Sequence, residues 1–279
     1  MRLGLITPVL TLNPRIHNSW ERDGTFDDVV CIVETADRLG LHHVTCSEHV
    51  AVPVAYEPTR GARYWDALAT FGFLAARTTS IRLATHVLVL GYHHPLEIAK
   101  RYGTLDRISE GRLVLGVGVG TLEAEFDLLG VPMSRRGERA DDALAALRAC
   151  LGRSHVEYHG EHYDFADLRV EPHASREDVP IWVGGRTRRS LRRAVELADG
   201  WAPFGLKRSD LASWLGGLDL PERFEVVAQP AAVVDPTGDL EAVDELLEQW
   251  ATAGATVVDL HLAHHSLEHY LEQIHALAS

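Results

Sequence analysis

Short aliphatic runs and amphipathic segments follow one another along most of the chain. The aliphatic runs favour buried strands, and the segments between them carry apolar residues at helical spacing, as in 27–39, which stops at Gly40. The predicted strands are 2–7, 43–46, 81–90, 112–117, 180–183, 200–203, 226–234 and 256–262. The predicted helices are 27–39, 66–77, 96–108, 123–129, 137–151, 187–197, 209–215, 239–250 and 267–277.

One stretch departs from this alternation. Between residues 152 and 178 the pattern changes, and 158–165 predicts a hairpin inserted before the strand at 180–183. Eight strands that alternate with helices, in a chain of 279 residues, predict an α/β fold, a (β/α)8 TIM barrel, as a single domain over 1–279. A doubly wound open sheet is the alternative. A barrel places chemistry on the loops that follow its strands.

Glycines gather where the strand at 112–117 ends. Gly116, Gly118 and Gly120 remove every other side chain there. Bare backbone amides suit a phosphate group or a flat heterocycle, because a ligand can lie directly against them. Close packing is the alternative, since small residues also let a helix approach a sheet.

A second glycine-rich strand end carries positive charge. Gly184 and Gly185 are followed by Arg186, Thr187 and two more arginines at the start of a predicted helix. Amides, a hydroxyl and guanidinium groups at a helix N-terminus form an anion site. The two glycine-rich ends together predict a phosphorylated cofactor with a planar ring.

Imidazoles also follow the predicted strands. His49, beside Glu48, comes after the strand at 43–46, where a group that titrates near neutral pH suits proton transfer or a hydrogen bond to a heterocycle. A partly exposed loop histidine is the alternative reading. His264 lies after the last strand in the same way, and it is a candidate for substrate contact, as is Trp65 at the end of the loop 50–64.

Composition excludes several classes of partner and chemistry. A net charge of −13 disfavours nucleic acid and anionic membranes, and no apolar run reaches the length of a membrane span. Three dispersed cysteines and the immediate entry into a strand predict a cytoplasmic protein. His155 and His159 have zincin-like spacing, but they fall in the predicted hairpin, so no metal site is expected. Neither Lys100 nor Lys207 ends a strand, which disfavours Schiff-base chemistry.

Several longer segments resemble a known family. They share their order and spacing with the bacterial luciferase-like superfamily of flavin- and deazaflavin-dependent barrels, and within it with the actinobacterial branch that depends on coenzyme F420. The matching segments are 36–40 (ADRLG), 44–49 (VTCSEH), 81–90 (IRLATHVLVL), 105–113 (LDRISEGRL), 115–126 (LGVGVGTLEAEF), 180–185 (PIWVGG) and 198–201 (ADGW). After residue 201 the resemblance is weak.

The resemblance implies roles for individual residues. Glu48 and His49 match the pair that faces the reactive carbon of the ring, with Glu48 orienting His49 or lying against the polar edge of the ring. A cis peptide bond would join His86 to Val87 behind the ring, although His86 replaces a small residue of the family. The segment that borders the cofactor matches Val119, Gly120 and Thr121, and Gly184, Gly185 and Thr187 match the phosphate grip.

The activity that the resemblance implies is hydride transfer between the deazaflavin carbon of F420 and a small organic substrate stacked on the ring. An FMN-dependent monooxygenase that uses reduced flavin and oxygen is the alternative, and a barrel that binds flavin without turnover is a third. A homodimer and a separate reductase that regenerates the cofactor are expected. The apolar residues predicted to form the dimer surface are Leu68, Phe71, Phe73, Leu74 and Ile98.

Overall fold

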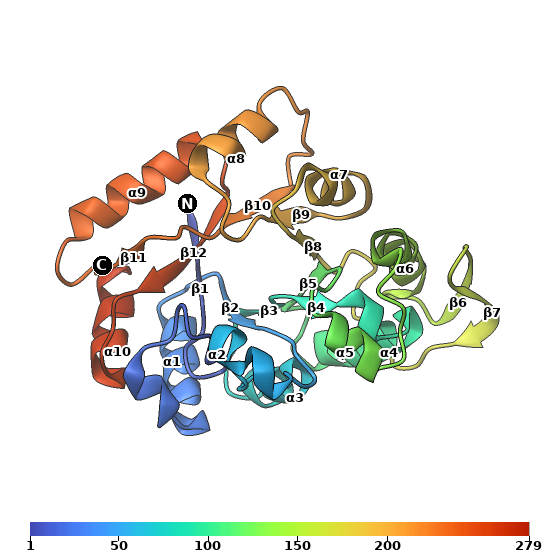
Figure 1. The fold of residues 1–279 in the computed structure, drawn as a ribbon, viewed down its shortest axis with the longest axis horizontal. Helices are drawn as coiled ribbons and strands as arrows, with labels where there is room; N and C mark the ends of the chain where they lie inside the picture. The colour runs from blue at the N-terminus through green and yellow to red at the C-terminus, as the bar shows by residue number, and fades with distance from the viewer. Residues whose placement is uncertain (279) are drawn as a thin grey trace.

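Eight parallel strands close into a barrel in the computed structural model, which describes residues 1–278. The ring runs β1-β2-β3-β5-β8-β9-β10-β12, and β12 pairs with β1. Figure 1 shows these strands crossing the centre of the molecule. Their bounds are β1 Arg2–Leu5, β2 His43–Cys46, β3 Arg82–Thr85, β5 Leu113–Gly118, β8 Ile181–Gly184, β9 Gly200–Ala202, β10 Glu225–Ala228 and β12 Val257–Leu262. The predicted TIM barrel is confirmed, and the open sheet is excluded.

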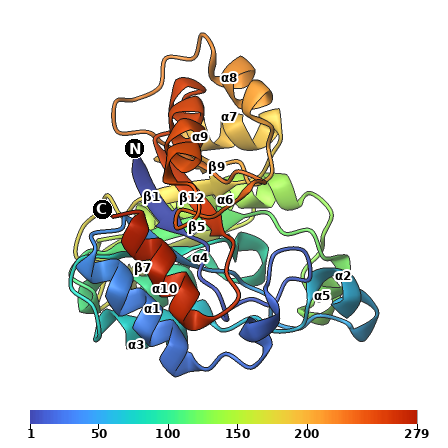
Figure 2. The ribbon, with the colours of Figure 1, turned by 90° about the vertical axis from the view of Figure 1, so that its left-hand side faces the viewer.

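Helices surround the barrel on all sides (Figures 1 and 2). Eight longer helices alternate with the strands: α1 Phe26–Arg38, α3 Ala67–Ala75, α4 Pro95–Ile108, α6 Arg136–Cys150, α7 Arg188–Leu197, α8 Arg208–Leu215, α9 Leu240–Thr252 and α10 Leu267–Ala276. Short helices lie in the loops: η1 Ser19–Arg22, η2 Val54–Tyr56, α2 Glu57–Arg60, η3 Leu90–Tyr92 and α5 Glu123–Leu128. No helix among residues 1–278 is both long enough and apolar enough to cross a membrane.

Two predicted strands are interrupted. The run at 81–90 divides into β3 and β4 (Leu88–Val89), and the peptide bond between His86 and Val87 is cis, as the resemblance implied. The run at 226–234 divides into β10 and β11 (Val233–Val234) on either side of Pro230, which has no N–H to donate to a neighbouring strand. Hydrophobicity alone did not show these breaks, because the residues on both sides are aliphatic.

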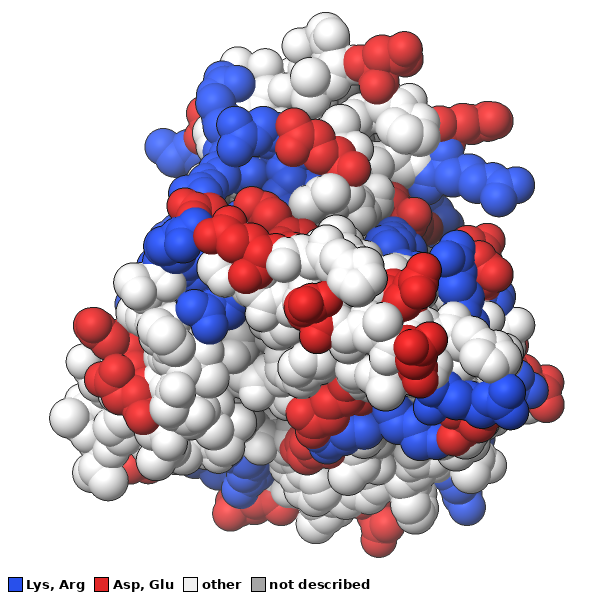
Figure 3. Space-filling view, turned by 90° about the vertical axis from the view of Figure 1, so that its right-hand side faces the viewer, with Lys and Arg blue, Asp and Glu red and all other residues white. Residues whose placement is uncertain are grey.

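The predicted hairpin is confirmed. Strands β6 (His155–His159) and β7 (Asp164–Arg169) pair antiparallel, with a bulge between Val156 and Tyr158. The hairpin projects from the barrel beside α6 (Figure 1). Figure 3 faces this side of the molecule, where basic and acidic side chains are interspersed.

Packing explains one glycine of the central run. A Cβ built on Gly116 would lie 1.9 Å from the carbonyl oxygen of Thr85, so the backbones of β3 and β5 meet too closely for any side chain there. The packing interpretation is therefore correct for Gly116. Gly118 and Gly120, which follow it, instead line a cavity.

Much of the apolar surface expected to form a dimer belongs to this chain's own core. Phe71, Leu74 and Ile98 are fully buried within the single chain. Phe73 is half exposed, and its ring packs edge-on against Phe26. These residues thus offer little apolar surface for a second subunit, and the homodimer stays a prediction.

Asp37 stabilises the turn that leads into β3. Its carboxylate accepts hydrogen bonds from the amides of Thr79, Ser80 and Ile81 at 2.7 to 2.8 Å, and from both hydroxyls of that turn. Burial raises the pKa of Asp37, but these hydrogen bonds lower it far more, so that the pKa lies well below the usual range.

We expect Asp37→Asn to lower the free energy of unfolding by about 1–3 kcal/mol at pH 7, because an amide cannot replace all these charge-assisted bonds. A lowered pKa stabilises the fold above the unfolded value of about 4, and this stabilisation is lost as the pH falls towards the folded value. Urea unfolding from pH 7 to pH 3 should show the difference between the two proteins shrinking below about pH 4. A difference independent of pH would contradict this role.

Candidate functional site

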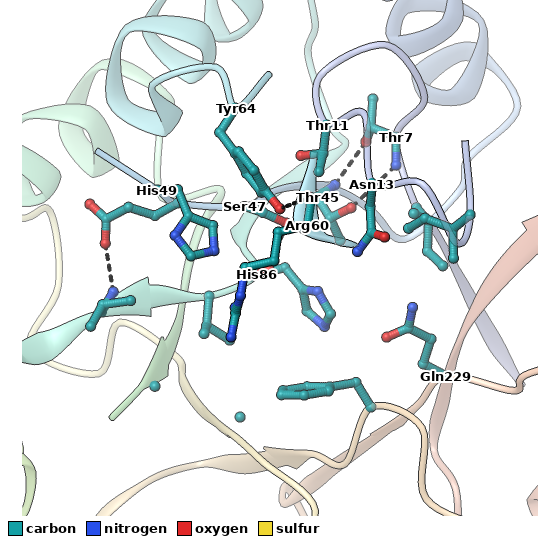
Figure 4. Close-up of a pocket in the computed structure, with 18 of the residues that line it drawn as sticks. Thr7, Thr11, Asn13, Thr45, Ser47, His49, Arg60, Tyr64, His86 and Gln229 are labelled. Atoms are coloured by element: carbon teal, nitrogen blue, oxygen red, sulfur yellow. Dashed lines mark hydrogen bonds between the residues drawn. The ribbon is translucent and has the colours of Figure 1, made fainter. Parts of the chain in front are cut away.

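A cavity of about 380 Å³ opens at the carboxyl ends of the barrel strands. Polar side chains reach into it from several loops, and Figure 4 shows Asn13, His86 and Gln229 extending towards the same open space. The residues that line it are Ile6, Thr7, Pro8, Thr11, Asn13, Ile16, His17, Glu21, Thr45, Ser47, Glu48, His49, Arg60, Tyr64, His86, Val87, Val89, Tyr92, Gly118, Val119, Gly120, Thr121, Gly184, Gly185, Phe204, Gln229, His261 and His264.

Two loops form the outer wall of the cavity and brace each other. Leu12 donates its amide to the carbonyl of Arg63, and Trp65 donates to the carbonyl of Leu10. Glu21, almost fully buried, accepts the amides of Val9 and Asn18. The loops 8–24 and 50–64 are therefore held in place, as expected for segments that shape a pocket.

His49 is held by a buried carboxylate from another element. Nδ1 of His49 lies 2.6 Å from Oε2 of Glu125 on α5, whose side chain is fully buried. Glu125 also accepts the hydroxyl of Tyr92 at 2.8 Å and the amides of Val50 and Ala51. The ring of His49 packs edge-on against Tyr64, with 4.5 Å between the centroids. One carboxylate thus fixes both the imidazole and the backbone that follows it.

The charge of Glu125 fixes the tautomer of His49. Burial raises the pKa of Glu125, but the hydrogen bonds from His49 and Tyr92 lower it overall, so the group is a carboxylate near neutral pH. Burial and Glu125 also raise the pKa of Tyr92, which stays a hydroxyl. Nδ1 of His49 must therefore donate, and Nε2, which has no protein partner within residues 1–278, is left to exchange a proton with a ligand.

Glu48 does not orient His49, which corrects one of its two expected roles. Its carboxylate accepts the amide of Val89 at 2.6 Å and lies 2.7 Å from Nε2 of His93. Burial lowers the pKa of His93, but its hydrogen bond to Glu48 raises the pKa overall, which favours an ion pair. Adjacent residues point to different partners here, because the chain leaves β2 at this point and neighbouring side chains diverge. The second role, against the polar edge of a ring, stays a prediction.

One wall of the cavity is bare backbone. A Cβ on Gly118 would lie 2.6 Å from a methyl of Val87, and one on Gly120 would lie 2.6 Å from the ring of Phe126. Gly120 also has φ of +75°, which disfavours any side chain. Val119, Gly184 and Gly185 line the same cavity, so the structure brings the two glycine-rich strand ends together.

The predicted phosphate grip lies only partly at the cavity. Gly185 lines it, but its amide already donates to the carbonyl of Ala202 at 3.2 Å. Thr187 caps α7 by accepting the amide of Ser190, and neither Thr187 nor the exposed Arg186 lines the cavity. At this end the cavity is therefore lined by Gly184 and Gly185, without a free amide from Gly185 and without Arg186 or Thr187.

Arg60 is the cation that the sequence prediction missed. Among the described residues that line the cavity, it is the sole arginine or lysine. Its two terminal nitrogens each lie 3.5 Å from the hydroxyl of Thr121, which is a weak contact. The guanidinium is thus available to an anionic ligand. Arg60 ends the short helix α2, in a stretch where the sequence predicted neither helix nor strand, so nothing there singled it out.

The two predicted substrate residues lie in different surroundings. Trp65 stacks on Phe26, with 4.9 Å between the centroids, and it does not line the cavity. His264 lines the cavity, but Trp20 donates to its Nδ1 at 2.8 Å and the amide group of Asn18 lies 2.9 Å from its Nε2. Burial lowers the pKa of His264 to about 4, so it is a neutral residue that supports the loop 8–24.

Two amide side chains complete the polar lining. Gln229 makes no hydrogen bond to any described residue, and Asn13 uses only its oxygens, with Oδ1 accepting the amide of Arg15. Both face the cavity in Figure 4. The amide of Gln229 and the unused NH2 group of Asn13 suit a heterocycle whose edge carries both donors and acceptors. Sequence analysis missed both, because neither belongs to a motif.

Relatives of known sequence share much of the chain. The chain matches the sequence model of the luciferase-like monooxygenase family over residues 1–277. An uncharacterized protein of Mycobacterium tuberculosis is 31% identical over 188 residues, which cover 63% of this chain and 65% of that protein. The oxygenase component of the flavin-dependent trigonelline monooxygenase from Acinetobacter baylyi is 26% identical over 185 residues, covering 65% of this chain and 49% of that protein. The matches thus span less than two thirds of the length of these curated relatives.

A solved structure shows the same fold. The coenzyme F420 dependent tetrahydromethanopterin reductase from Methanopyrus kandleri superposes with a TM-score of 0.76 at 15% sequence identity, over 100% of this chain and 97% of that chain. At this identity the likeness concerns the fold alone. Because the family model covers nearly all of the chain, the protein belongs to the luciferase-like monooxygenase family.

Proposed function

We propose that this protein is an F420-dependent oxidoreductase that transfers hydride between the deazaflavin carbon and a small organic substrate. The observation that carries the proposal is the imidazole of His49, held by buried Glu125 at a cavity with a bare glycine wall. Family membership supports oxidoreductase chemistry on a flavin-type ring. The reductase with the same fold supports the choice of F420.

The residues of the cavity fit such a cofactor. A flat ring can lie against the segment from Gly118 to Gly120, where two of the three residues carry no side chain. The side-chain amide of Gln229 and the NH2 group of Asn13 can bind its polar edge, and Arg60 can bind the phosphate. When bound, F420 supplies a carbon that gives or takes a hydride and reacts poorly with oxygen.

The protein's own contribution is a proton at a fixed atom. Hydride delivery to a carbonyl, imine or conjugated alkene leaves a developing negative charge, which an acid stabilises. Nε2 of His49 is the atom that exchanges this proton, because Nδ1–H is held by Glu125. The doubly protonated ring gives its proton from Nε2 and is left as the Nδ1–H tautomer.

An FMN-dependent monooxygenase is the second candidate, and the trigonelline monooxygenase relative favours it. The monooxygenase requires oxygen, whereas the F420-dependent reaction proceeds without it. We expect a panel of carbonyl, imine and alkene substrates, mixed with reduced F420 under anaerobic conditions, to include one whose addition oxidises the cofactor. Turnover seen only with reduced FMN and oxygen would instead establish the monooxygenase, and binding without any turnover would leave a flavin-binding barrel.

Arg60 should contribute to binding of an anionic ligand. We expect Arg60→Gln to weaken the affinity for F420 by about tenfold at low ionic strength, with a smaller loss at high salt, because exposed charge pairs are screened. Fluorescence titration of F420 at two salt concentrations measures both effects. Arg169→Gln on the exposed hairpin is the control, and an equal loss in both variants would exclude a specific contact.

A further inference from the structure

The interior of the barrel contains a buried pair of a carboxylate and an imidazole. Asp259 on β12 and His43 on β2 are both fully buried, and Nε2 of His43 lies 2.9 Å from Oδ1 of Asp259. Within the described chain, neither oxygen of Asp259 completes a hydrogen bond of good geometry. Burial raises the pKa of Asp259, but His43 lowers it overall, so the carboxylate is ionised. A buried charge with incomplete partners is costly, and an apolar pair would be cheaper.

The first strand makes room for this pair. Gly4 on β1 is in register with His43 on one side and with Asp259 on the other. A Cβ on Gly4 would lie 2.1 Å from Cε1 of His43 and 2.4 Å from Oδ1 of Asp259. Any residue with a side chain at position 4 would collide with His43 and Asp259 as they are placed. The residues on β1, β2 and β12 therefore match one another at this level of the barrel.

The pair of Asp259 and His43 connects to the cavity through His86. Nε2 of His86 lies 3.9 Å from Oδ2 of Asp259, a separation that a small ring rotation or one bridging water converts into hydrogen bonding. The same ring lines the cavity and packs edge-on against Phe204. Figure 4 shows it reaching into the open space. Burial lowers the pKa of His86 overall, and the charge of Asp259 opposes this effect.

A row of titratable side chains continues from His43 towards the other end of the barrel. Nδ1 of His43 lies 3.0 Å from Nδ1 of His42, and Nε2 of His42 lies 3.2 Å from the guanidinium of Arg82. Arg2, half exposed, contacts His42 and pairs with Glu225. Titratable groups therefore extend from the cavity to side chains that meet solvent.

We propose that His86, Asp259 and His43 form a buried proton relay that ends at the cavity, with His86 exchanging the proton with the ligand. As one proton leaves His86 for the ligand, Asp259 passes one to His86 and takes one from His43, and no electrons move. Burial, His43 and the guanidinium groups of Arg82 and Arg2 lower the pKa of His42 to about 3, so the relay begins at His43 and not at His42. The relay goes beyond the proposed function, because it serves any cavity ligand that gains or loses a proton. His49 and His86 would serve different atoms of that ligand.

Asp259→Asn tests the central link in the ligand-free protein. The variant keeps the shape of the side chain and removes its charge, so the protonated form of His86 loses its anionic neighbour. We expect the pKa of His86, followed by NMR of nitrogen-15-labelled histidine and assigned with His86→Gln, to fall by about one unit. Asp106→Asn, which removes a fully buried carboxylate elsewhere, should leave that titration unchanged.

Two further measurements test whether His86, Asp259 and His43 are coupled. If Asp259→Asn does not fold, His86→Gln should still change the imidazole resonances of His43, since both rings contact one carboxylate. In the loaded enzyme, Asp259→Asn should lower turnover, and the loss should grow as the pH rises and neutral His86 accumulates. An unchanged titration of His86 in folded Asp259→Asn, or unchanged His43 resonances in His86→Gln, would overturn the relay whether or not F420 is the cofactor.

Discussion

His49→Ala should lower the rate of the chemical step by about 10²- to 10⁴-fold, the usual contribution of a positioned general acid. The affinity for the cofactor should fall much less, because the glycine wall and the free amides do not depend on His49. Single-turnover oxidation of bound, reduced F420 by a substrate from the panel measures the step, and fluorescence titration measures the affinity.

Two variants separate proton transfer from a structural role of His49. His49→Asn retains a polar side chain without a titratable group, and it should be as slow as His49→Ala. His155→Ala on the exposed hairpin controls for the loss of an imidazole elsewhere, and its rate should be normal. If folded His49→Ala oxidises reduced F420 at the normal rate, His49 has no part in the mechanism.

Glu125→Gln should lower turnover by about 10²-fold, the loss that follows when a reacting group is displaced by about an ångström. The neutral amide can present either its oxygen or its nitrogen to Nδ1–H of His49, so it no longer fixes the ring as the carboxylate does. Glu125 acts through His49, so it is a positioning residue. The pH dependence of the chemical step should change in this variant, which a purely structural loss would not produce.

Tyr92→Phe is the matched control for the Glu125→Gln variant. It removes one donor to the same carboxylate and leaves the pair with His49 intact, so the loss in turnover should be several-fold smaller. Glu125→Asp should recover part of the activity, because the charge returns on a shorter side chain. Equal losses in Tyr92→Phe and Glu125→Gln would show that the network matters only for folding.

The local pattern of hydrophobic and polar residues was sufficient to predict the barrel. Aliphatic runs became strands because both faces of each strand are covered, and helical spacing gave the helices on the outside. The glycine-rich ends at Gly120 and Gly184 reached one cavity because the carboxyl ends of all barrel strands meet at one face. The breaks at His86 and Pro230 needed the three-dimensional arrangement.

Partners across the fold could not be read from the sequence. His49 pairs with Glu125, which is 76 residues away, whereas its sequence neighbour Glu48 pairs with His93. Gly4 became informative only once β1 lay between His43 and Asp259. Such contacts depend on which side chains point into the barrel. The pattern of aliphatic residues along one strand does not show which side chains of other strands they will meet.

The most direct test of the account is a paired fluorescence titration of the purified protein with F420 and with FMN at the same ionic strength. We predict that F420 binds with at least about tenfold higher affinity than FMN. The reduced F420 bound in this way should then pass hydride to a substrate without oxygen. Tight binding of FMN together with no measurable binding of F420 would contradict the account.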